Sequence, residues 1–385
     1  MTSPSIRYAV FYGAVFLTLG IYLPFWPLWL ESRGLGAAEI GLLFALSSWL
    51  RVATTPALAQ VSDRSGRAKA TLAVLAGISL LAFAGFFAVT GFWQILALQL
   101  LAVTLFQALV PLGESQAITA VYRQDLDYGR MRLWGSVAFI VGALGGGRLI
   151  AETGPGGLDL ILLLILAALG ATFLAALALP VGPAAPRRED RGRLGDLLRG
   201  RGFWLLLLTA GLLQASHAVY YGFSALHWQA AGHDSALVGW LWAEGVIAEV
   251  LLFALAGRLF RKTPPAWLLA GAGLAGVVRW SLTGAGDGLA VLVAAQLLHA
   301  GTFGLAHLGA IHAIARAAPP GLAASAQSLY AALSGGLAMG LAMLAAGRLY
   351  ADFGGGAFYA MAGLSAAGLL CALVLVLVPA RHRDS

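Results

Sequence analysis

Long apolar segments follow one another along almost the whole chain, and short polar segments separate them. Twelve of these segments are long enough to cross a bilayer as helices, because about 20 mostly apolar residues span its hydrocarbon core. They lie at residues 8–30, 38–60, 70–90, 93–122, 131–152, 158–180, 203–230, 236–257, 266–284, 288–316, 320–350 and 354–378. Strands of a membrane barrel would be shorter and would alternate in polarity. We therefore predict an all-α membrane protein with twelve transmembrane helices.

The composition supports a membrane protein. Sixty percent of the 385 residues are hydrophobic and 11% are charged, whereas soluble domains carry about 25% charged residues. The first apolar run begins at Tyr8, exceeds the length of a signal-peptide core and ends at Glu31 without a small-residue cleavage site, so we expect it to stay as a helix. The single cysteine, Cys371, lies in the last apolar segment, which excludes a disulfide within the chain.

Two related halves are expected on either side of a polar stretch. The longest polar stretch, residues 181–202, lies midway along the chain. GRLIAETG at Gly147–Gly154 and GRLYADFG at Gly347–Gly354 end the fifth and eleventh apolar segments. We predict pseudo-symmetric six-helix bundles at residues 1–180 and 203–385, joined by a cytoplasmic linker. Repeated halves around a midplane cavity are a common design for transport by alternating access.

The distribution of basic residues predicts how the chain is oriented. With twelve spans and the N-terminus inside, 19 of the 24 Lys and Arg residues fall in or beside cytoplasmic segments. This skew follows the positive-inside rule and places both termini in the cytoplasm. The net charge of +7 is therefore explained by topology, and we expect no nucleic-acid partner. Arginine outnumbers lysine 22 to 2, which suggests a GC-rich bacterial genome and an inner (plasma) membrane.

Several ionisable side chains lie inside the apolar segments, where a charge costs roughly 2.5–3.5 kcal/mol on insertion scales. They are Arg51, Glu114, Arg132, His217, Glu244, Glu249, Arg279, His299 and His307. One interpretation is that they form ion pairs between helices, and the other is that they meet a substrate or a proton. Glu244 and Glu249 are five residues apart, so they point roughly 140° away from each other. The histidines of the tenth segment have no acidic residue at metal-binding spacing, and we expect no metal site.

The loop between the second and third segments, SDRSGRAK at residues 62–69, concentrates charge around a glycine. Its side chains are either ordinary cytoplasmic anchors or a latch that breaks and reforms as the halves move. We predict a gating loop at Asp63, Arg64, Gly66 and Arg67.

This loop resembles the signature of the major facilitator superfamily. More closely, the chain resembles the phenylpropionate permease family and, more distantly, lactose permease and related oligosaccharide–proton symporters. The stretches that carry the resemblance are GIYLPFWPLWL (20–30), LDYGRMRLWGSVAF (126–139), HAVYYGFSALHWQAAG (217–232), VGWLWAEGVIAEVLLFAL (238–255) and LLHAGTF (297–303). The resemblance implies the major facilitator fold.

The resemblance to lactose permease also implies roles for single residues. Glu114 and Arg132 match the spacing of its sugar-binding acid–arginine pair, and Glu244 matches the acid that links sugar binding to protonation. Arg279 and His299 match an arginine and a histidine of its ninth and tenth helices.

Four positions depart from lactose permease. Its proton-carrying carboxylate corresponds to Thr302, its galactose-stacking tryptophan to Phe139, and its eleventh-helix lysine to Gly335. Arg51 has no charged counterpart there, but Arg51 and Glu249 resemble an arginine and a glutamate of the phenylpropionate family.

We predict a secondary active transporter that takes up a small organic acid, such as an aromatic acid, together with protons. Intramembrane arginines suit a carboxylate, and burial favours a carboxyl group that carries the proton. Proton-coupled transport of a sugar, oligosaccharide or nucleoside and efflux of drugs are the alternatives. No enzyme motif is present in the spans, and we expect a monomer without a cofactor. The predicted substrate-binding residues are Arg51, Glu114, Arg132, Phe139 and Arg279, and the predicted proton-coupling residues are Glu244, Glu249 and His299.

Overall fold

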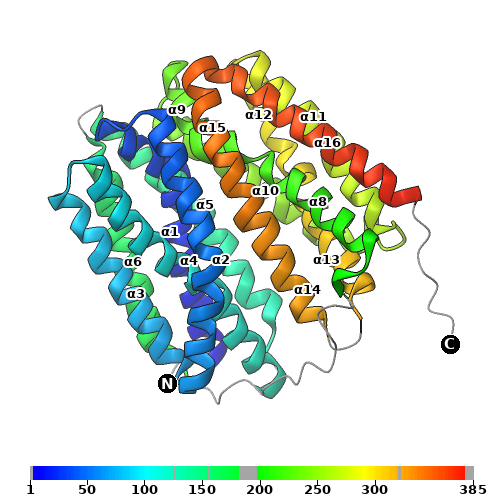
Figure 1. Ribbon diagram of the computed structural model, residues 1–385. Coiled ribbons are helices and arrows are strands. Elements are labelled where there is room, and N and C mark those ends of the chain that lie inside the picture. Colours follow the sequence, from blue (N-terminus) through cyan, green and yellow to red (C-terminus); the bar gives the residue numbers. More distant parts are fainter. Residues whose placement is uncertain (1–2, 125, 155–156, 182–196, 320–321, 378–385) are drawn as a thin grey trace. The chain divides into compact units, whose positions relative to one another are not determined.

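A computed structural model of the protein describes residues 3–124, 126–154, 157–181, 197–319 and 322–377 (Figure 1). These residues are almost entirely helical, and no strand occurs among them. Residues 182–196, which make up most of the predicted linker, and the C-terminal residues 378–385 lie outside the described residues. The prediction of an all-α protein is confirmed.

Eleven helical stretches among the described residues are long and apolar enough to cross a membrane. The last of them, Ala323–Leu377, has 55 residues, or roughly 80 Å of helix, which is more than one crossing needs. It covers residues 323–350 and 354–377 of the eleventh and twelfth predicted spans and is interrupted at Gly354–Gly356, where Gly354 has a positive φ of 53°. The structure is therefore consistent with twelve crossings.

The chain forms two compact units. The first consists of residues 1–187 and 221–243, and the second of residues 188–220 and 244–385. Helices α9 and α10 are each divided between the units, so the boundaries differ from the predicted halves at residues 1–180 and 203–385. That division into two six-helix bundles stays a prediction.

The first unit is built around α1. Its helices are α1 (Pro4–Ser32), α2 (Ala37–Ser65), α3 (Ala68–Ala84), η1 (Gly85–Ala88), α4 (Phe92–Gln124), α5 (Tyr128–Thr153) and α6 (Asp159–Ala178), with parts of α9 (Ala218–Ala230) and α10 (Ser235–Leu259). Helix α1 packs against α5 and α6, while α4 packs against α2 and α3. Pro4 in the first turn of α1 and Asp127 as the N-cap of α5 suit helix starts.

Small residues let α1 and α5 approach closely. A Cβ on Gly142 would lie 2.7 Å from the carbonyl oxygen of Leu17, and a Cβ on Gly20 would collide with the backbone of Phe139. Glycine at this crossing therefore serves helix packing, as small residues do in membrane bundles. The crossing fixes α5, which carries Arg132.

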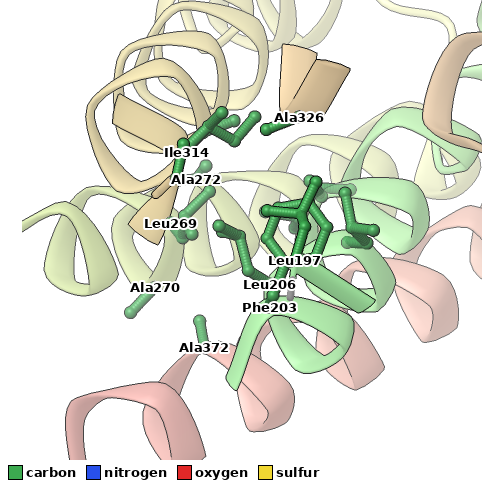
Figure 2. Close-up of a cluster of buried hydrophobic side chains, with 14 of the residues drawn as sticks. Leu197, Phe203, Leu206, Leu269, Ala270, Ala272, Ile314, Ala326 and Ala372 are labelled. Atoms are coloured by element: carbon green, nitrogen blue, oxygen red, sulfur yellow. The ribbon is translucent and has the colours of Figure 1, made fainter. Parts of the chain in front are cut away.

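The second unit is built around α11. Its helices are α8 (Arg201–Ala215), α11 (Pro265–Ala285), α12 (Leu289–Leu297), η3 (Ala300–Leu305), α13 (Ala306–Ala317), α14 (Ala323–Tyr330), η4 (Ala331–Ala338), α15 (Met339–Phe353), η5 (Gly354–Gly356) and α16 (Ala357–Leu377). Helix α11 packs against α16, α13 and η3. An apolar core joins α8, α11, α13 and α16, with Phe203, Leu206, Leu269 and Ile314 among its members (Figure 2).

Two segments of the second unit are π-helical, at Ala300–Leu305 and Ala331–Ala338. A π-helical turn inserts an extra residue into an α-helix and often marks a functional site. The first of these segments starts directly after His299 and contains Thr302. This π-helical segment therefore follows a predicted site residue, His299, and packs against α11.

Candidate functional site

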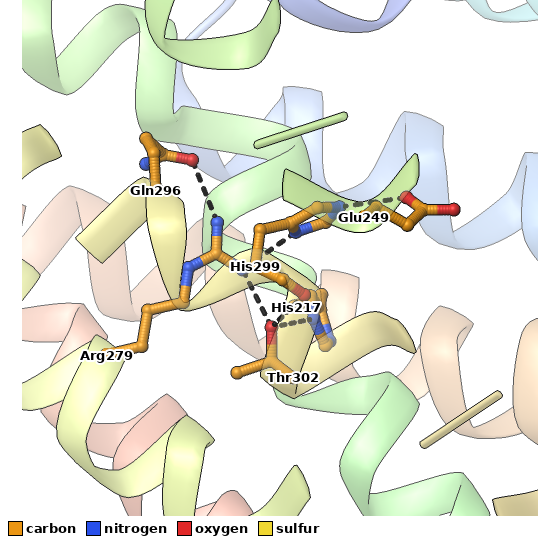
Figure 3. A network of polar contacts seen from close by, with 6 residues as sticks. All are labelled: His217, Glu249, Arg279, Gln296, His299 and Thr302. Carbon is orange, nitrogen blue, oxygen red and sulfur yellow. Dashed lines mark hydrogen bonds and ion pairs between the residues drawn. The ribbon is translucent and has the colours of Figure 1, made fainter. Parts of the chain in front are cut away.

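Arg279 lies at the centre of a polar cluster in the second unit (Figure 3). It lies on α11 and is completely buried, at 0% exposure. The guanidinium donates from Nη1 to Nδ1 of His299 and to Oγ1 of Thr302, both at 2.9 Å, and from Nη2 to Oε1 of Gln296 at 3.0 Å. These three acceptors are uncharged, and an arginine side chain stays protonated.

Two aromatic rings complete the surroundings of Arg279. The guanidinium carbon lies 4.6 Å from the ring centre of Tyr220 and 4.3 Å from that of Trp280. Cations are attracted to aromatic faces, most strongly where water is excluded. Hydrogen bonds at the edges of the guanidinium and rings at its faces hold this cation in one orientation.

The bond from Arg279 determines the tautomer of His299. Because Nδ1 accepts a hydrogen from Nη1, it carries none itself, and the imidazole is neutral with its hydrogen on Nε2. Nε2 lies 3.6 Å from Oε2 of Glu249 in α10. A line of polar contacts therefore leads from the buried guanidinium through one imidazole to a carboxylate.

His217 joins the same cluster from the turn between α8 and α9. Its Nδ1 lies 3.0 Å from the carbonyl oxygen of Leu213, and its Nε2 lies 3.2 Å from Oγ1 of Thr302. The carbonyl can only accept, so Nδ1 carries the hydrogen and Nε2 of the neutral ring is an acceptor. The single hydrogen of the Thr302 hydroxyl is shared between this Nε2 and the carbonyl oxygen of His299, which also lies at 3.2 Å. The two histidines thus have opposite tautomers, and Thr302 links the second one to Arg279.

The two glutamates of α10 have different surroundings. The side chain of Glu249 is 20% exposed and faces His299, whose side chain is 8% exposed. Glu244 is half-buried, and its Oε2 is buried with no hydrogen-bond partner among the described residues. Of the three predicted proton-coupling residues, the structure brings Glu249 and His299 together.

A second candidate cluster lies in the first unit, where α4, α5 and α1 meet. Nε of Arg132 is 3.7 Å from Oε1 of Glu114, and their side chains are 31% and 34% exposed. The guanidinium carbon of Arg132 lies 4.0 Å from the ring centre of Phe16 and 5.9 Å from that of Tyr12. The predicted acid–arginine pair is thus close in space, and an aromatic ring supports it from behind.

Arg51 of α2 contacts the same face of α4 that carries Glu114. Nη1 of Arg51 donates to Oε1 of Gln107 at 2.9 Å. Gln107 and Glu114 are seven residues apart on α4, which is two turns, or about 10 Å along the helix axis. One face of α4 therefore positions Arg51 and Arg132 at two levels of the first unit.

The remaining predicted site residues lie away from these clusters. Phe139 is buried at the α1–α5 crossing. Asp63, Arg64, Gly66 and Arg67 are all exposed: the first two lie in the last turn of α2, and the other two connect α2 to α3. Gly66 adopts a positive φ of 61° there, a conformation that glycine allows. The role of this turn as a gating loop stays a prediction.

Several residues of both clusters carried no signal in the sequence. Phe16 is a common residue type in apolar helices, and nothing in the spacing of Gln107 or Gln296 relates them to a distant arginine. A signal did exist for His217 and Thr302, since a buried histidine and a buried hydroxyl need partners. Among the described residues, no three His, Cys, Asp or Glu side chains group as a metal site would require.

Comparisons with known proteins agree with this architecture. Residues 5–361 match the model of the MFS_1 like family. A probable 3-phenylpropionic acid transporter of Escherichia coli (strain K12) is 37% identical, over 92% of this chain and 93% of the relative. Maltose permease of Geobacillus stearothermophilus is 28% identical, over 98% of this chain and 95% of the relative.

Solved structures show the same fold. The crystal structure of the nucleoside transporter NupG, as a D323A mutant, has a TM-score of 0.87 over 97% of this chain and 100% of that one, at 15% identity. A bacterial homologue of the iron transporter ferroportin has a TM-score of 0.72 over 98% of this chain and 99% of that one, at 16% identity. The predicted major facilitator fold and the expected transport of a small molecule across a membrane are confirmed, and the chain belongs to the MFS_1 like family of major facilitator transporters.

Proposed function

We propose that the protein takes up a small organic acid together with a proton, and that an aromatic acid of the phenylpropionate type is its substrate. The observation that carries this proposal is the line of contacts from Arg279 through His299 to Glu249. It supplies one permanent positive charge and one carboxylate that can bind a proton. The relative described as a probable 3-phenylpropionic acid transporter supports the choice of substrate.

The cluster couples proton and anion through charge balance. With Glu249 ionised, the charges of Arg279 and Glu249 compensate each other through the imidazole between them. When Glu249 binds a proton, the positive charge of Arg279 is no longer compensated. A carboxylate substrate that enters together with the proton leaves the total charge of the protein unchanged, which avoids adding a charge to a region of low dielectric.

The hydrogen bonds support Glu249, rather than His299, as the proton carrier. Nδ1 of His299 is occupied by a hydrogen of Arg279, so a second proton on this ring would break that bond. Glu249 is partly exposed and has a carboxylate oxygen 3.6 Å from Nε2 of His299. In this proposal His299 stays neutral beside the carrier, and Arg279 fixes His299.

Arg51 is the residue that we propose for contact with the substrate carboxylate. Its side chain is partly exposed, and Gln107 orients the guanidinium by a bond at one nitrogen. A guanidinium can bind a carboxylate with two parallel hydrogen bonds. This assignment uses the charge of Arg51 and leaves the Glu114–Arg132 pair for another part of the substrate.

The setting of this transport is a bacterial inner membrane, and we propose that the protein acts there as a monomer with both termini in the cytoplasm. The skew of Lys and Arg toward the predicted cytoplasmic segments supports this orientation. The bacterial relatives support the choice of membrane.

A sugar or a nucleoside is the second candidate substrate. The Glu114–Arg132 pair offers a hydrogen-bond acceptor and several donors at about one-third exposure, which suits hydroxyl groups. Maltose permease and a putative nucleoside transporter are among the relatives. For a neutral substrate, Arg51 would have no anion to bind.

Uptake into proteoliposomes tests the proposal and separates these candidates. Labelled 3-phenylpropionate should accumulate when the outside is made acidic, and a protonophore should abolish the accumulation. Unlabelled aromatic acids should compete, whereas maltose and uridine should not. Accumulation that ignores the proton gradient would refute proton symport, and competition by maltose or uridine alone would identify the second candidate.

A further inference from the structure

The Arg132 side chain has a geometry that differs from that of an arginine placed to bind a carboxylate. Its guanidinium carbon lies over the Phe16 ring, 4.0 Å from the ring centre. Its Nε edge is turned toward Glu114, at 3.7 Å from the carboxylate oxygen. The side chain is nevertheless 31% exposed.

Gly135 leaves room for this arrangement. A Cβ at this position would lie 2.9 Å from Nη1 of Arg132 and 3.1 Å from Cδ2 of Phe16. The first distance is too short for atoms that are not bonded, and the second is tighter than most carbon–carbon contacts, so the guanidinium would have to move. The absence of a side chain one turn after Arg132 therefore allows the guanidinium to fold back onto the Phe16 ring.

Charge argues against a substrate carboxylate at Arg132. The carboxylate of Glu114 already lies beside it, at 34% exposure, and a second carboxylate there would be repelled by the first. An aromatic ring on the exposed face of the guanidinium avoids this conflict. It leaves Glu114 in place, and it gains the attraction between a cation and the face of a ring.

We propose that Arg132, supported by Phe16, is the platform on which the aromatic ring of the substrate stacks. This inference rests on the proposed function, because it assigns the ring of the aromatic acid to the first unit. The ring forms the outer layer of a stack whose middle layer is the Arg132 guanidinium and whose inner layer is Phe16. Gly135 is a positioning residue that leaves room for the Arg132 guanidinium over the Phe16 ring.

The platform and an ordinary apolar pocket predict opposite preferences between an aromatic and a saturated ring. A cyclohexyl ring has more apolar surface than a phenyl ring, so an apolar pocket favours the saturated ring. A guanidinium face favours the phenyl ring, because only an aromatic ring has a negative face. The pair 3-phenylpropionate and 3-cyclohexylpropionate therefore tests the chemistry of the subsite at nearly constant size and charge.

The experiment measures the Kd of both acids for the purified full chain by isothermal titration calorimetry. We expect 3-phenylpropionate to bind about fivefold more tightly, which corresponds to about 1 kcal/mol. Arg132→Lys keeps the charge but loses the planar face, and it should bring the ratio of the two Kd values to about one. Gly135→Ala should lower the ratio in the same way, because its methyl group lifts the guanidinium off Phe16.

A matched control lies on the same helix. Gly145→Ala adds the same methyl group where no atom lies within 4 Å, and it should keep the fivefold ratio. An unchanged ratio in both Arg132→Lys and Gly135→Ala, or a wild-type preference for the cyclohexyl acid, overturns the platform. If Gly135→Ala does not fold, the result for Arg132→Lys alone decides.

Failure of the platform and failure of the proposed function give different results. Equal binding and proton-driven uptake of both acids by the wild type would refute the platform and leave aromatic-acid symport standing. Binding of neither acid, together with uptake of maltose or uridine, would refute the proposed function itself.

Discussion

Replacing Glu249 by Gln tests the coupling cluster most directly. The substitution removes the carboxylate that lies beside His299 but keeps the shape of the side chain. Its amide oxygen can take the place of the carboxylate oxygen, which lies 3.6 Å from Nε2 of His299. We therefore expect the free energy of unfolding to fall by less than about 1 kcal/mol. Transport should continue as exchange, while accumulation against a gradient should be lost.

The magnitude of that loss follows from the number of groups that can titrate. Arg279 stays protonated, and Nδ1 of His299 is occupied by its bond to Arg279, so in the proposed mechanism Glu249 carries one proton per cycle. One proton that moves with one organic anion transfers no net charge. Each unit of pH difference is worth about 1.36 kcal/mol, or a tenfold concentration ratio. A gradient of about two units should therefore give the wild type an accumulation of up to about 100-fold, and Glu249→Gln a ratio near one.

The assay uses proteoliposomes with an imposed pH difference and labelled 3-phenylpropionate. Counterflow, in which vesicles loaded with unlabelled acid take up labelled acid, measures exchange without a proton gradient and should persist in Glu249→Gln. Glu244→Gln is the matched control on the same helix. Normal accumulation by Glu249→Gln would refute the reasoning and move the proton to Glu244 or His299. A wild-type accumulation that depends on membrane potential would refute the one-to-one coupling.

Three further substitutions test other parts of the structure. Arg51→Gln should abolish uptake of 3-phenylpropionate, whereas Arg51→Lys should only weaken it, because lysine keeps the charge without bidentate geometry; initial uptake rates measure both. Thr302→Val removes an acceptor of Arg279 and the hydroxyl beside His217. It should lower the free energy of unfolding by about 1–3 kcal/mol, measured as a lower Tm in detergent. Thr302→Ser keeps the hydroxyl and should have a Tm near that of the wild type. Gly142→Ala puts a methyl group 2.7 Å from the Leu17 carbonyl oxygen and should lower the Tm by a similar amount, in contrast to Gly145→Ala.

Most of the fold can be predicted from the sequence because the bilayer sets the length of each apolar run. The predicted span 131–152 falls within α5 (Tyr128–Thr153), and the predicted span 266–284 falls within α11 (Pro265–Ala285). Breaks within spans are harder to foresee. The predicted span 203–230 is divided at Ser216 and His217, and no proline or glycine marks that turn.

The candidate site is predictable only in part, and the reason is that hydropathy identifies costly charges without identifying their partners. Arg279, His299 and Glu249 stand out in the sequence because each is ionisable within an apolar helix. Their mutual contacts depend on how α10, α11 and the segment after α12 are packed. Uncharged members of the clusters such as Gln296 and Phe16 can be recognised only in the structure.

The cluster also gives a physical reason for threonine at position 302, where the resemblance to lactose permease places a carboxylate. The Thr302 hydroxyl accepts from Arg279 without adding charge. A glutamate there, together with Glu249, would give the cluster two negative charges against one positive charge, and binding one proton would make it only neutral. With threonine, binding of one proton at Glu249 leaves a net positive charge. A cluster that becomes positive on protonation attracts an organic anion, whereas a neutral sugar gains nothing from that charge. The loss of the carboxylate at position 302 and its presence at Glu249 therefore favour an anionic substrate.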